Sequence, residues 1–331
     1  MQEFIKKLPK AELHVHIEGT LEPEQLLLFA DRNKIKIPFS SVAAVREAYK
    51  FTNLQSFLDL YYQGESVLCT EQDFYDLTAS YFKKISEQGV VHAEIFFETQ
   101  TYHERGIAFG TIITGIYAAA TQAEKLYGIT SALILCFLRH LSEQDAFIAL
   151  QESLPYRDKI IGIGLASSEL GNPPAKFKQV FQEARNYGYH AVVHAGEEAG
   201  PDYIWEALTI LGAERIDHGV QCMKDPQLVQ ELLTRKIPLT VCPLSNVALQ
   251  IYKNLEEHPI KRMLDAGLCV SINSDDPAYF GGYIAENYQA VAECFEMSKK
   301  DLIIIARNSI IGSFMPEDKK NKLLNSEILL Y

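Results

Sequence analysis

Residues 11–19 read Ala-Glu-Leu-His-Val-His-Ile-Glu-Gly, and they decide how the rest of the chain is interpreted. The apolar run Ala11–His16 predicts a buried strand, and Gly19 marks its end. Because successive side chains of a strand point to opposite faces, His14 and His16 project from the same side. Two imidazoles about 7 Å apart on one strand face can chelate a divalent ion. The pair alone fits two hydrogen-bonded histidines equally well, so any further ligands must come from elsewhere in the chain.

The composition is that of a globular protein with a large core. The 331 residues are 47% hydrophobic and 22% charged, and the formal charge of −12 argues against nucleic acid as a partner. The sequence has no 18-residue apolar run and does not begin like a signal peptide, so no membrane partner is expected. Six scattered cysteines without a Cys-X-X-Cys pair indicate reduced thiols and a cytoplasmic location. The oligomeric state is not fixed, and a homo-oligomer stays open.

Short apolar strands alternate with longer amphipathic segments along the chain. Eight strands are expected, at Ala11–His16, Val90–Phe97, Ser131–Leu138, Ile160–Leu165, His190–His194, Arg215–His218, Pro238–Cys242 and Cys269–Asn273. Nearly all-apolar strands separated by helices imply a parallel sheet that is covered on both faces. Eight of them predict an α/β fold of the (β/α)8 TIM-barrel type, with residues 1–331 forming a single domain. A doubly wound open sheet is the alternative, but no Gly-X-Gly-X-X-Gly motif follows a strand to favour it.

The segment from about 22 to 88 is longer than one crossover helix requires. It contains helical patterns at Leu54–Leu68 and Glu71–Gln88, with an interruption around Ile37–Ser40. We interpret it as a helical insertion after the first strand, on the same side as His14 and His16. A lid over the barrel mouth and additional packing around the barrel are both consistent with this pattern.

Polar residues gather at the ends of several predicted strands. In a barrel all carboxyl ends meet at one rim, so residues that are distant in sequence come together there. His14 and His16 would then meet His194 from the fifth strand and Asp275 from the eighth. Three histidines and one carboxylate predict a catalytic metal site, with one Zn²⁺ per chain.

The neighbouring polar residues suit hydrolysis at such a metal, because a bound ion lowers the pKa of its water. His218 is a candidate to hold or deprotonate that water, and Glu197 is a candidate acid for the leaving group. Asp276 follows a predicted ligand, so it either orients that ligand or accepts a hydrogen bond from substrate.

Five motifs, in this order, resemble the adenosine/adenine deaminase family of the amidohydrolase superfamily over nearly the whole chain. They are Glu12-Leu13-His14-Val15-His16, Leu138-Arg139-His140, His194-Ala195-Gly196-Glu197, Asp217-His218-Gly219 and Ser274-Asp275-Asp276-Pro277. The resemblance implies a zinc barrel that replaces the 6-amino group of a purine by oxygen and releases ammonia. By position, Glu197 would protonate ring N1, His218 would position the attacking water and Asp276 would hydrogen-bond N7.

Two further features resemble the adenine branch of this family. Glu18 stands where nucleoside deaminases typically have Asp, and its extra methylene and negative charge would occupy the ribose space. Residues 167–169, Ser-Ser-Glu, run into Gly171-Asn172-Pro173-Pro174, which resembles the adenine-type motif. The resemblance places the Ser167 backbone amide against ring N3 and adds Glu169 to the substrate-binding residues. Conversion of adenine to hypoxanthine and ammonia is therefore the expected reaction.

The chain also departs from that branch. Ala166 replaces the usual Asp, and Glu98-Thr99 replaces the common Asp-Pro. An N6-substituted adenine or adenosine is accordingly the alternative substrate. A catalytically idle scaffold that binds metal and purine is a non-enzymatic alternative, but such a scaffold has no need of Glu197, His218 and Asp276.

Overall fold

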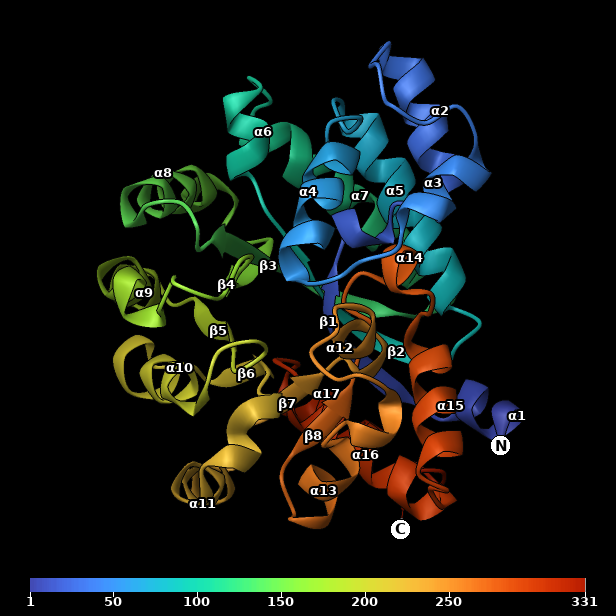
Figure 1. The fold of residues 1–331 in the computed structure, drawn as a ribbon, viewed down its shortest axis with the longest axis vertical. Helices are drawn as coiled ribbons and strands as arrows, with labels where there is room; N and C mark the ends of the chain where they lie inside the picture. The colour runs from blue at the N-terminus through green and yellow to red at the C-terminus, as the bar shows by residue number, and fades with distance from the viewer. Residues whose placement is uncertain (331) are drawn as a thin grey trace.

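The computed structural model describes residues 1–330, so the last residue of the predicted domain, Tyr331, lies outside the described part. Eight parallel strands form one sheet in the order β1 to β8, and Figure 1 shows them at the centre of the molecule with helices around them. The strands are β1 (Lys10–His16), β2 (Val90–Phe97), β3 (Thr130–Leu138), β4 (Ile160–Ala166), β5 (His190–Ala195), β6 (Arg215–His218), β7 (Leu239–Val241) and β8 (Val270–Ile272). The predicted (β/α)8 barrel is confirmed.

The barrel closes where the first strand meets the chain just beyond the last one. Val15 and Asp275 form a single parallel bridge, in which the His16 N–H donates to the Asp275 carbonyl at 3.0 Å. The Asp275 N–H donates in turn to the His14 carbonyl, also at 3.0 Å. Lower in the seam a side chain replaces the ladder, because the Leu13 N–H donates to Asn273 Oδ1 at 2.8 Å. This substitution explains why β8 ends before Asn273, one residue earlier than predicted.

A buried ion pair fills the barrel interior beneath this rim. The Arg215 guanidinium on β6 pairs with Glu94 on β2 and donates to the Leu13 carbonyl on β1 at 3.1 Å. All three groups are fully buried. Burial raises the pKa of a carboxyl, but at Glu94 the charges and hydrogen bonds of Arg215 and His92 together outweigh it and lower the pKa to about 2. The pair therefore joins three strands through charged hydrogen bonds between fully buried groups.

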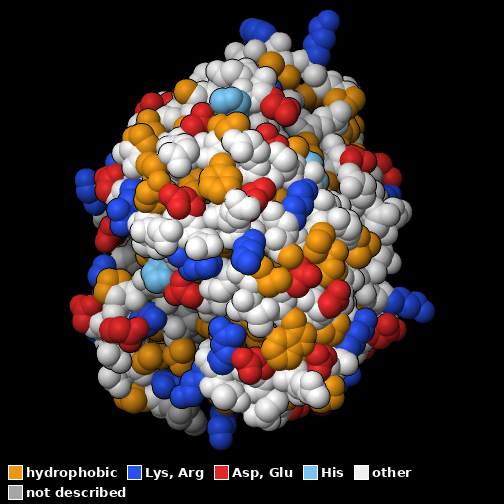
Figure 2. Space-filling model, turned by 90° about the vertical axis from the view of Figure 1, so that its left-hand side faces the viewer, with side chains coloured by type: hydrophobic (Ala, Val, Ile, Leu, Met, Phe, Trp, Pro, Cys, Tyr) orange, Lys and Arg blue, Asp and Glu red, His pale blue; other side chains and the backbone are white. Residues whose placement is uncertain are grey.

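Helices cover the outside of the barrel, and α8, α9, α10 and α11 follow one another along one side of Figure 1. The helices outside the N-terminal insertion are α1 (Gln2–Lys7), α6 (Gln100–Glu104), α7 (Phe109–Tyr127), α8 (Glu143–Ser153), α9 (Lys178–Asn186), α10 (Pro201–Glu206), α11 (Pro226–Arg235), α12 (Pro243–Ala248), α13 (Ile260–Asp265), α14 (Pro277–Phe280), α15 (Ile284–Cys294), α16 (Lys299–Ile311) and α17 (Glu317–Leu324). Figure 2 shows this side with acidic and basic side chains interspersed among hydrophobic ones. Among residues 1–330, no helix is both long enough and apolar enough to span a bilayer.

The predicted insertion contains four helices that serve two different purposes. They are α2 (Pro23–Asn33), α3 (Val42–Ala48), α4 (Leu54–Glu65) and α5 (Glu71–Ile85). Helix α5 packs on the outside of the barrel against α7, so closely that a Cβ at Gly115 would lie 2.4 Å from the Glu71 carbonyl oxygen. Helix α4 instead lies over the rim, in front of β1 in Figure 1, and lines a cavity there.

Candidate active site

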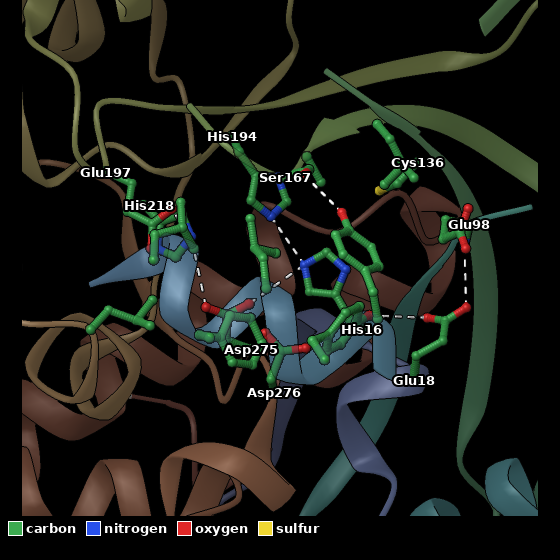
Figure 3. A pocket seen from close by; sticks show the side chains of 18 residues that line it. His16, Glu18, Glu98, Cys136, Ser167, His194, Glu197, His218, Asp275 and Asp276 are labelled. Carbon is green, nitrogen blue, oxygen red and sulfur yellow. Dashed lines mark hydrogen bonds and ion pairs between the residues drawn. The ribbon is translucent and has the colours of Figure 1, made fainter. Parts of the chain in front are cut away.

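The four predicted ligand residues converge on one point at the barrel rim, and Figure 3 shows three of them, His16, His194 and Asp275. The Nε2 atoms of His14 and His16 lie 3.2 and 3.5 Å from Asp275 Oδ1. His194 lies near the carboxyl end of β5, and its Nε2 atom is 3.1 Å from that of His16. The strand-end arrangement predicted from the sequence is therefore the arrangement in the structure, with Asp275 brought in by the closing bridge.

In His14 and His194, the other ring nitrogen, Nδ1, faces a hydrogen-bond acceptor. His14 Nδ1 lies 3.0 Å from the Thr240 hydroxyl oxygen, and that hydroxyl donates to Asp217 Oδ1 at 2.8 Å. His194 Nδ1 lies 3.3 Å from Asp217 Oδ2. An acceptor at Nδ1 keeps the proton on that nitrogen and leaves Nε2 as a free lone pair. One buried carboxylate, Asp217, thus orients both rings, and Arg215 lies 3.6 Å from it.

This donor set fits a divalent metal ion. Burial and the neighbouring His194 lower the pKa of His16 to about 3, and burial also lowers the pKa of His194, so both imidazoles are neutral. His14 Nε2 is buried and has no hydrogen-bond partner within residues 1–330. Ser245 donates to Asp275 Oδ2 at 2.7 Å, which leaves Oδ1 facing the histidines. Neutral imidazoles and a carboxylate are ligands of zinc and related metals.

His218 lies beside this cluster, at the end of β6. Its Nε2 atom is 3.5 Å from Glu197 Oε2 and 3.8 Å from Asp275 Oδ2. The donor atoms of His14, His194, His218 and Asp275 all lie within 4.8 Å of one another. Distance alone therefore does not separate His218 from the ligands.

A cavity opens directly above the cluster, between the barrel rim and α4. Two carboxyl oxygens in its wall, Glu197 Oε1 and Asp276 Oδ1, are buried and have no hydrogen-bond partner among the described residues. Burial, followed by the charge of Asp275, raises the pKa of both carboxyls well above the usual range. Both oxygens are therefore free to form hydrogen bonds with a bound molecule, and the raised pKa favours the protonated form of each carboxyl.

Asp276 reaches the cavity because Gly19 has no side chain. A Cβ at Gly19 would lie 2.0 Å from Asp276 Oδ1 and 2.7 Å from its Cα. The glycine that ends the predicted first strand is thus required by the close approach of the segment that follows β8.

Glu18 lines the same cavity, but its charge differs from the prediction. Its carboxyl accepts from the Glu98 backbone N–H at 3.3 Å and from the Tyr61 hydroxyl at 3.5 Å. Burial, together with the neighbouring Glu98 carboxyl, raises the pKa of Glu18 to about 8. The expected fixed negative charge is therefore wrong near neutral pH, because most of this carboxyl is protonated there. What Glu18 contributes is bulk and hydrogen bonding.

Ser167 and Ala166 form the wall contributed by β4. The Ser167 hydroxyl is held between Tyr62 of α4 and His140 Nδ1, each at 2.8 Å, and the residue has a left-handed φ of 79°. Ala166 packs in a small apolar cluster that includes Phe96 and Cys136. The loss of a carboxylate at position 166 therefore leaves an apolar wall.

Glu169, which was predicted to bind substrate, does not line this cavity. Its buried carboxylate accepts four backbone N–H groups of residues 196–199, at 2.7 to 3.1 Å. Its oxygens are fully used in holding the loop that follows β5 and carries Glu197. We therefore replace the predicted substrate contact with a positioning contact.

Sequence reasoning missed several residues of the site. Glu98 was noted only as a departure from the family, and Tyr61 and Tyr62 were not considered, although α4 carries apolar residues with helical spacing. Thr240 gave no signal because one hydroxyl in an apolar strand is common. Asp217 stood within a quoted motif, and its position one residue before the end of the predicted strand Arg215–His218 was the available signal.

A parallel eight-stranded barrel with a buried His/Asp cluster and unpartnered carboxyl oxygens at its rim is typical of a metal-dependent hydrolase of the TIM-barrel class. The comparison with known families specifies the class further. The adenosine deaminase family model matches residues 9–329, and the chain belongs to this family.

Individual relatives cover nearly the whole chain. It is 55% identical to a protein named adenine deaminase from Chlorobium phaeobacteroides (strain BS1), with 97% of this chain and 96% of the relative covered. It is also 55% identical to an adenine deaminase of Wolinella succinogenes, with 97% of each chain covered.

Solved structures agree with this assignment. The crystal structure of adenine deaminase from Arthrobacter aurescens superposes with a TM-score of 0.94 at 47% identity, covering 96% of this chain and 97% of that one. An amidohydrolase from Burkhoderia ambifaria with bound Zn has a TM-score of 0.89 at 24% identity, covering 97% and 90%, and shows the same fold.

Replacing Glu169 by Gln should destabilise the protein. The amide offers one acceptor oxygen and presents N–H donors to backbone N–H groups, so at least one buried N–H loses its partner, at about 1–3 kcal/mol. Urea unfolding measures the loss. Glu198→Gln is the matched control, since its half-buried side chain lies outside this contact, and it should change stability by less than about 0.5 kcal/mol. Equal stabilities of the two variants would contradict the positioning contact.

Proposed function

We propose that this chain is a zinc-dependent adenine deaminase that converts adenine and water into hypoxanthine and ammonia. The relatives at 52–56% identity over nearly the full chain support this reaction. The observation that carries the mechanism is the pair of unpartnered carboxyl oxygens, on Glu197 and Asp276, that face the cavity beside the metal cluster. His14, His16, His194 and Asp275 would hold one zinc ion.

The purine edge supplies the partners that these groups lack. Glu197, as a carboxylic acid, donates to ring N1, and Asp276 donates to ring N7, both of which are acceptors in adenine. The Ser167 backbone amide faces N3, in agreement with the use of its hydroxyl by Tyr62 and His140. Three polar contacts from three strand ends fix one orientation of the ring, with C6 toward the metal cluster.

Zinc, when bound, lowers the pKa of a water molecule and so provides a nucleophile near neutral pH. His218 holds this water for attack on C6, and Glu197 delivers a proton to N1 as the C6–O bond forms. The C6 hydroxyl then becomes the C6 carbonyl and gives up its proton to the amino group, the C6–N6 bond breaks, and ammonia leaves. Hypoxanthine keeps the proton that Glu197 delivered to N1, and Glu197 regains the proton that the water lost on becoming hydroxide, so the atoms of adenine and one water are all accounted for.

The cavity wall around Glu18 supports a free base over a nucleoside. Glu18 and Glu98 line the cavity together with Tyr61 and other side chains of α4, and Glu18 is hydrogen-bonded to the Glu98 N–H and the Tyr61 hydroxyl. A sugar on N9 would meet these side chains, and steric exclusion discriminates more strongly than the loss of a single contact. In this proposal the whole chain acts as one barrel domain, with α4 as the lid.

Ammonia release from adenine, adenosine and N6-methyladenine tests the substrate. We expect kcat/KM for adenine to exceed that for adenosine by at least about 10²-fold, because a base-sized pocket excludes ribose. Glu18→Asp should raise adenosine turnover by removing one methylene. Adenosine turnover that equals or exceeds that of adenine in the wild-type protein would rule out the free-base proposal.

Glu197→Gln separates acid catalysis from folding. The amide keeps the shape of the side chain but cannot deliver a proton to N1, so kcat should fall by roughly 10²–10⁴-fold. Zinc content, measured in the same preparation, should stay at the wild-type level. A variant that loses zinc yet retains its turnover per bound metal would assign Glu197 a structural role.

Elemental analysis of purified active protein should give about one zinc per chain, because the two donor groups found among the described residues share Asp275 and so form a single centre. His194→Ala removes one imidazole and should lose both the metal and the activity. Active protein that contains no stoichiometric metal would contradict the proposed centre.

A further inference from the structure

His218 sits among the metal-binding histidines, yet a different group faces its Nδ1 atom. There Asn246 Nδ2 lies 3.3 Å away, where His14 and His194 have acceptors instead. Because a side-chain amide nitrogen can only donate, His218 Nδ1 must accept. The identity of the amide atoms therefore decides the tautomer of His218, and the surrounding hydrogen bonds fix that identity.

The donor and acceptor roles in this chain of hydrogen bonds are fixed by a backbone N–H group, which can only donate. The backbone N–H of Ile260, the first residue of α13, donates to His258 Nδ1 at 3.2 Å. First-turn N–H groups have no partner inside their own helix, so this donor is free for a side chain. His258 therefore accepts at Nδ1 and, as a neutral ring, carries its proton on Nε2. Burial, together with Arg262, lowers the pKa of His258 to about 3, which keeps the ring neutral.

The proton on His258 Nε2 in turn determines how the Asn246 amide is oriented. His258 Nε2 lies 3.1 Å from Asn246 Oδ1, and a protonated Nε2 requires an acceptor there. The amide oxygen is thus turned toward His258 and the amide nitrogen toward His218. All three side chains are buried, so water does not offer an alternative partner.

We propose that Asn246 and His258 are positioning residues that hold His218 in the Nε2–H tautomer. In that form Nε2 carries a proton and cannot be a metal ligand, although it lies 3.8 Å from Asp275 Oδ2. His218 then acts as a hydrogen-bond donor toward the reacting water and Glu197. The two alternatives left by the sequence, holding or deprotonating the water, are thereby reduced to holding it.

The partner of each Nδ1 atom thus distinguishes two kinds of histidine in one cluster. An acceptor behind His14 and His194 leaves Nε2 as a lone pair, whereas a donor behind His218 places a proton on Nε2. The inference rests on the proposed function for the role of the water, but the tautomer itself is measurable without substrate.

Asn246→Asp is the discriminating variant, with Asn287→Asp as its matched control. Asp has the shape of Asn but cannot donate, so His218 should move its proton to Nδ1. Asn287 is a fully buried asparagine whose amide oxygen accepts from the Leu244 N–H of α12 and whose amide nitrogen donates to the Gly282 and Tyr283 carbonyls, so none of its hydrogen bonds involves His218. It controls for the general effect of a buried carboxylate.

The first measurement is the ¹H–¹⁵N correlation pattern of histidine-labelled metal-loaded enzyme, with the His218 signals assigned from their absence in His218→Asn. Wild type and Asn287→Asp should show His218 protonated on Nε2, and Asn246→Asp should show it protonated on Nδ1. The second measurement is adenine turnover, where kcat of Asn246→Asp should be roughly 10²-fold below that of the control, with KM changed less than threefold. An Nδ1–H signal for His218 in wild type, or an unchanged His218 pattern in Asn246→Asp, overturns the proposal.

A second pair of variants carries the test if Asn246→Asp does not fold. His258→Gln keeps an N–H donor for Asn246 Oδ1, whereas His258→Leu removes it and lets the amide turn over. We expect His258→Gln to retain the Nε2–H pattern of His218 and His258→Leu to lose it, with kcat falling only in the latter. Identical patterns and rates in the two variants overturn the proposal. Wild-type protein that fails to deaminate adenine, but shows the expected tautomers, would refute the proposed function alone.

Discussion

The site depends on the bridge between Val15 and Asp275, because this bridge closes the barrel and assembles the metal cluster at the same time. Its two backbone hydrogen bonds join Asp275 to the carbonyl of His14 and the N–H of His16. The carboxylate of the eighth strand's end is thereby placed against the two histidines of the first. A parallel barrel can close only in a register that matches both strands, so correct closure and correct ligand geometry are a single requirement.

Beneath this bridge, fully buried charged side chains hold the residues of the site in position. Arg215 joins Glu94 and the Leu13 carbonyl, and Asp217 on the same strand supports His14 through Thr240 and His194 directly. Removing one member of such a network leaves an uncompensated buried charge, which costs more than the intact network contributes. The barrel floor is therefore part of the reaction site, although no ligand atom comes from it.

Above the bridge, buried carboxyls have raised pKa values, whereas the pKa of Glu94 beneath it is lowered. Glu197, Asp276 and Glu18 lie near other carboxyls with little compensating positive charge, and burial raises the pKa of each. Carboxyls that retain protons can donate to the acceptor nitrogens of a purine. One fold thus lowers the pKa of the carboxyls that hold the histidine rings and raises the pKa of those that line the cavity, and the neighbouring charges make the difference.

The sequence by itself determined the barrel and its rim, and it predicted the side chains that we propose to bind metal. Those features are written in local patterns, namely apolar strands separated by helices and polar residues at the strand ends, and parallel strands bring such ends together. Only the tertiary structure decided which nitrogen of each histidine faces the centre, that Glu169 holds a loop, that Glu18 is largely protonated, and that α5 packs outside while α4 covers the rim. These properties depend on partners such as Thr240, Asn246 and Glu98, which are far away in sequence and come into contact only when the barrel closes.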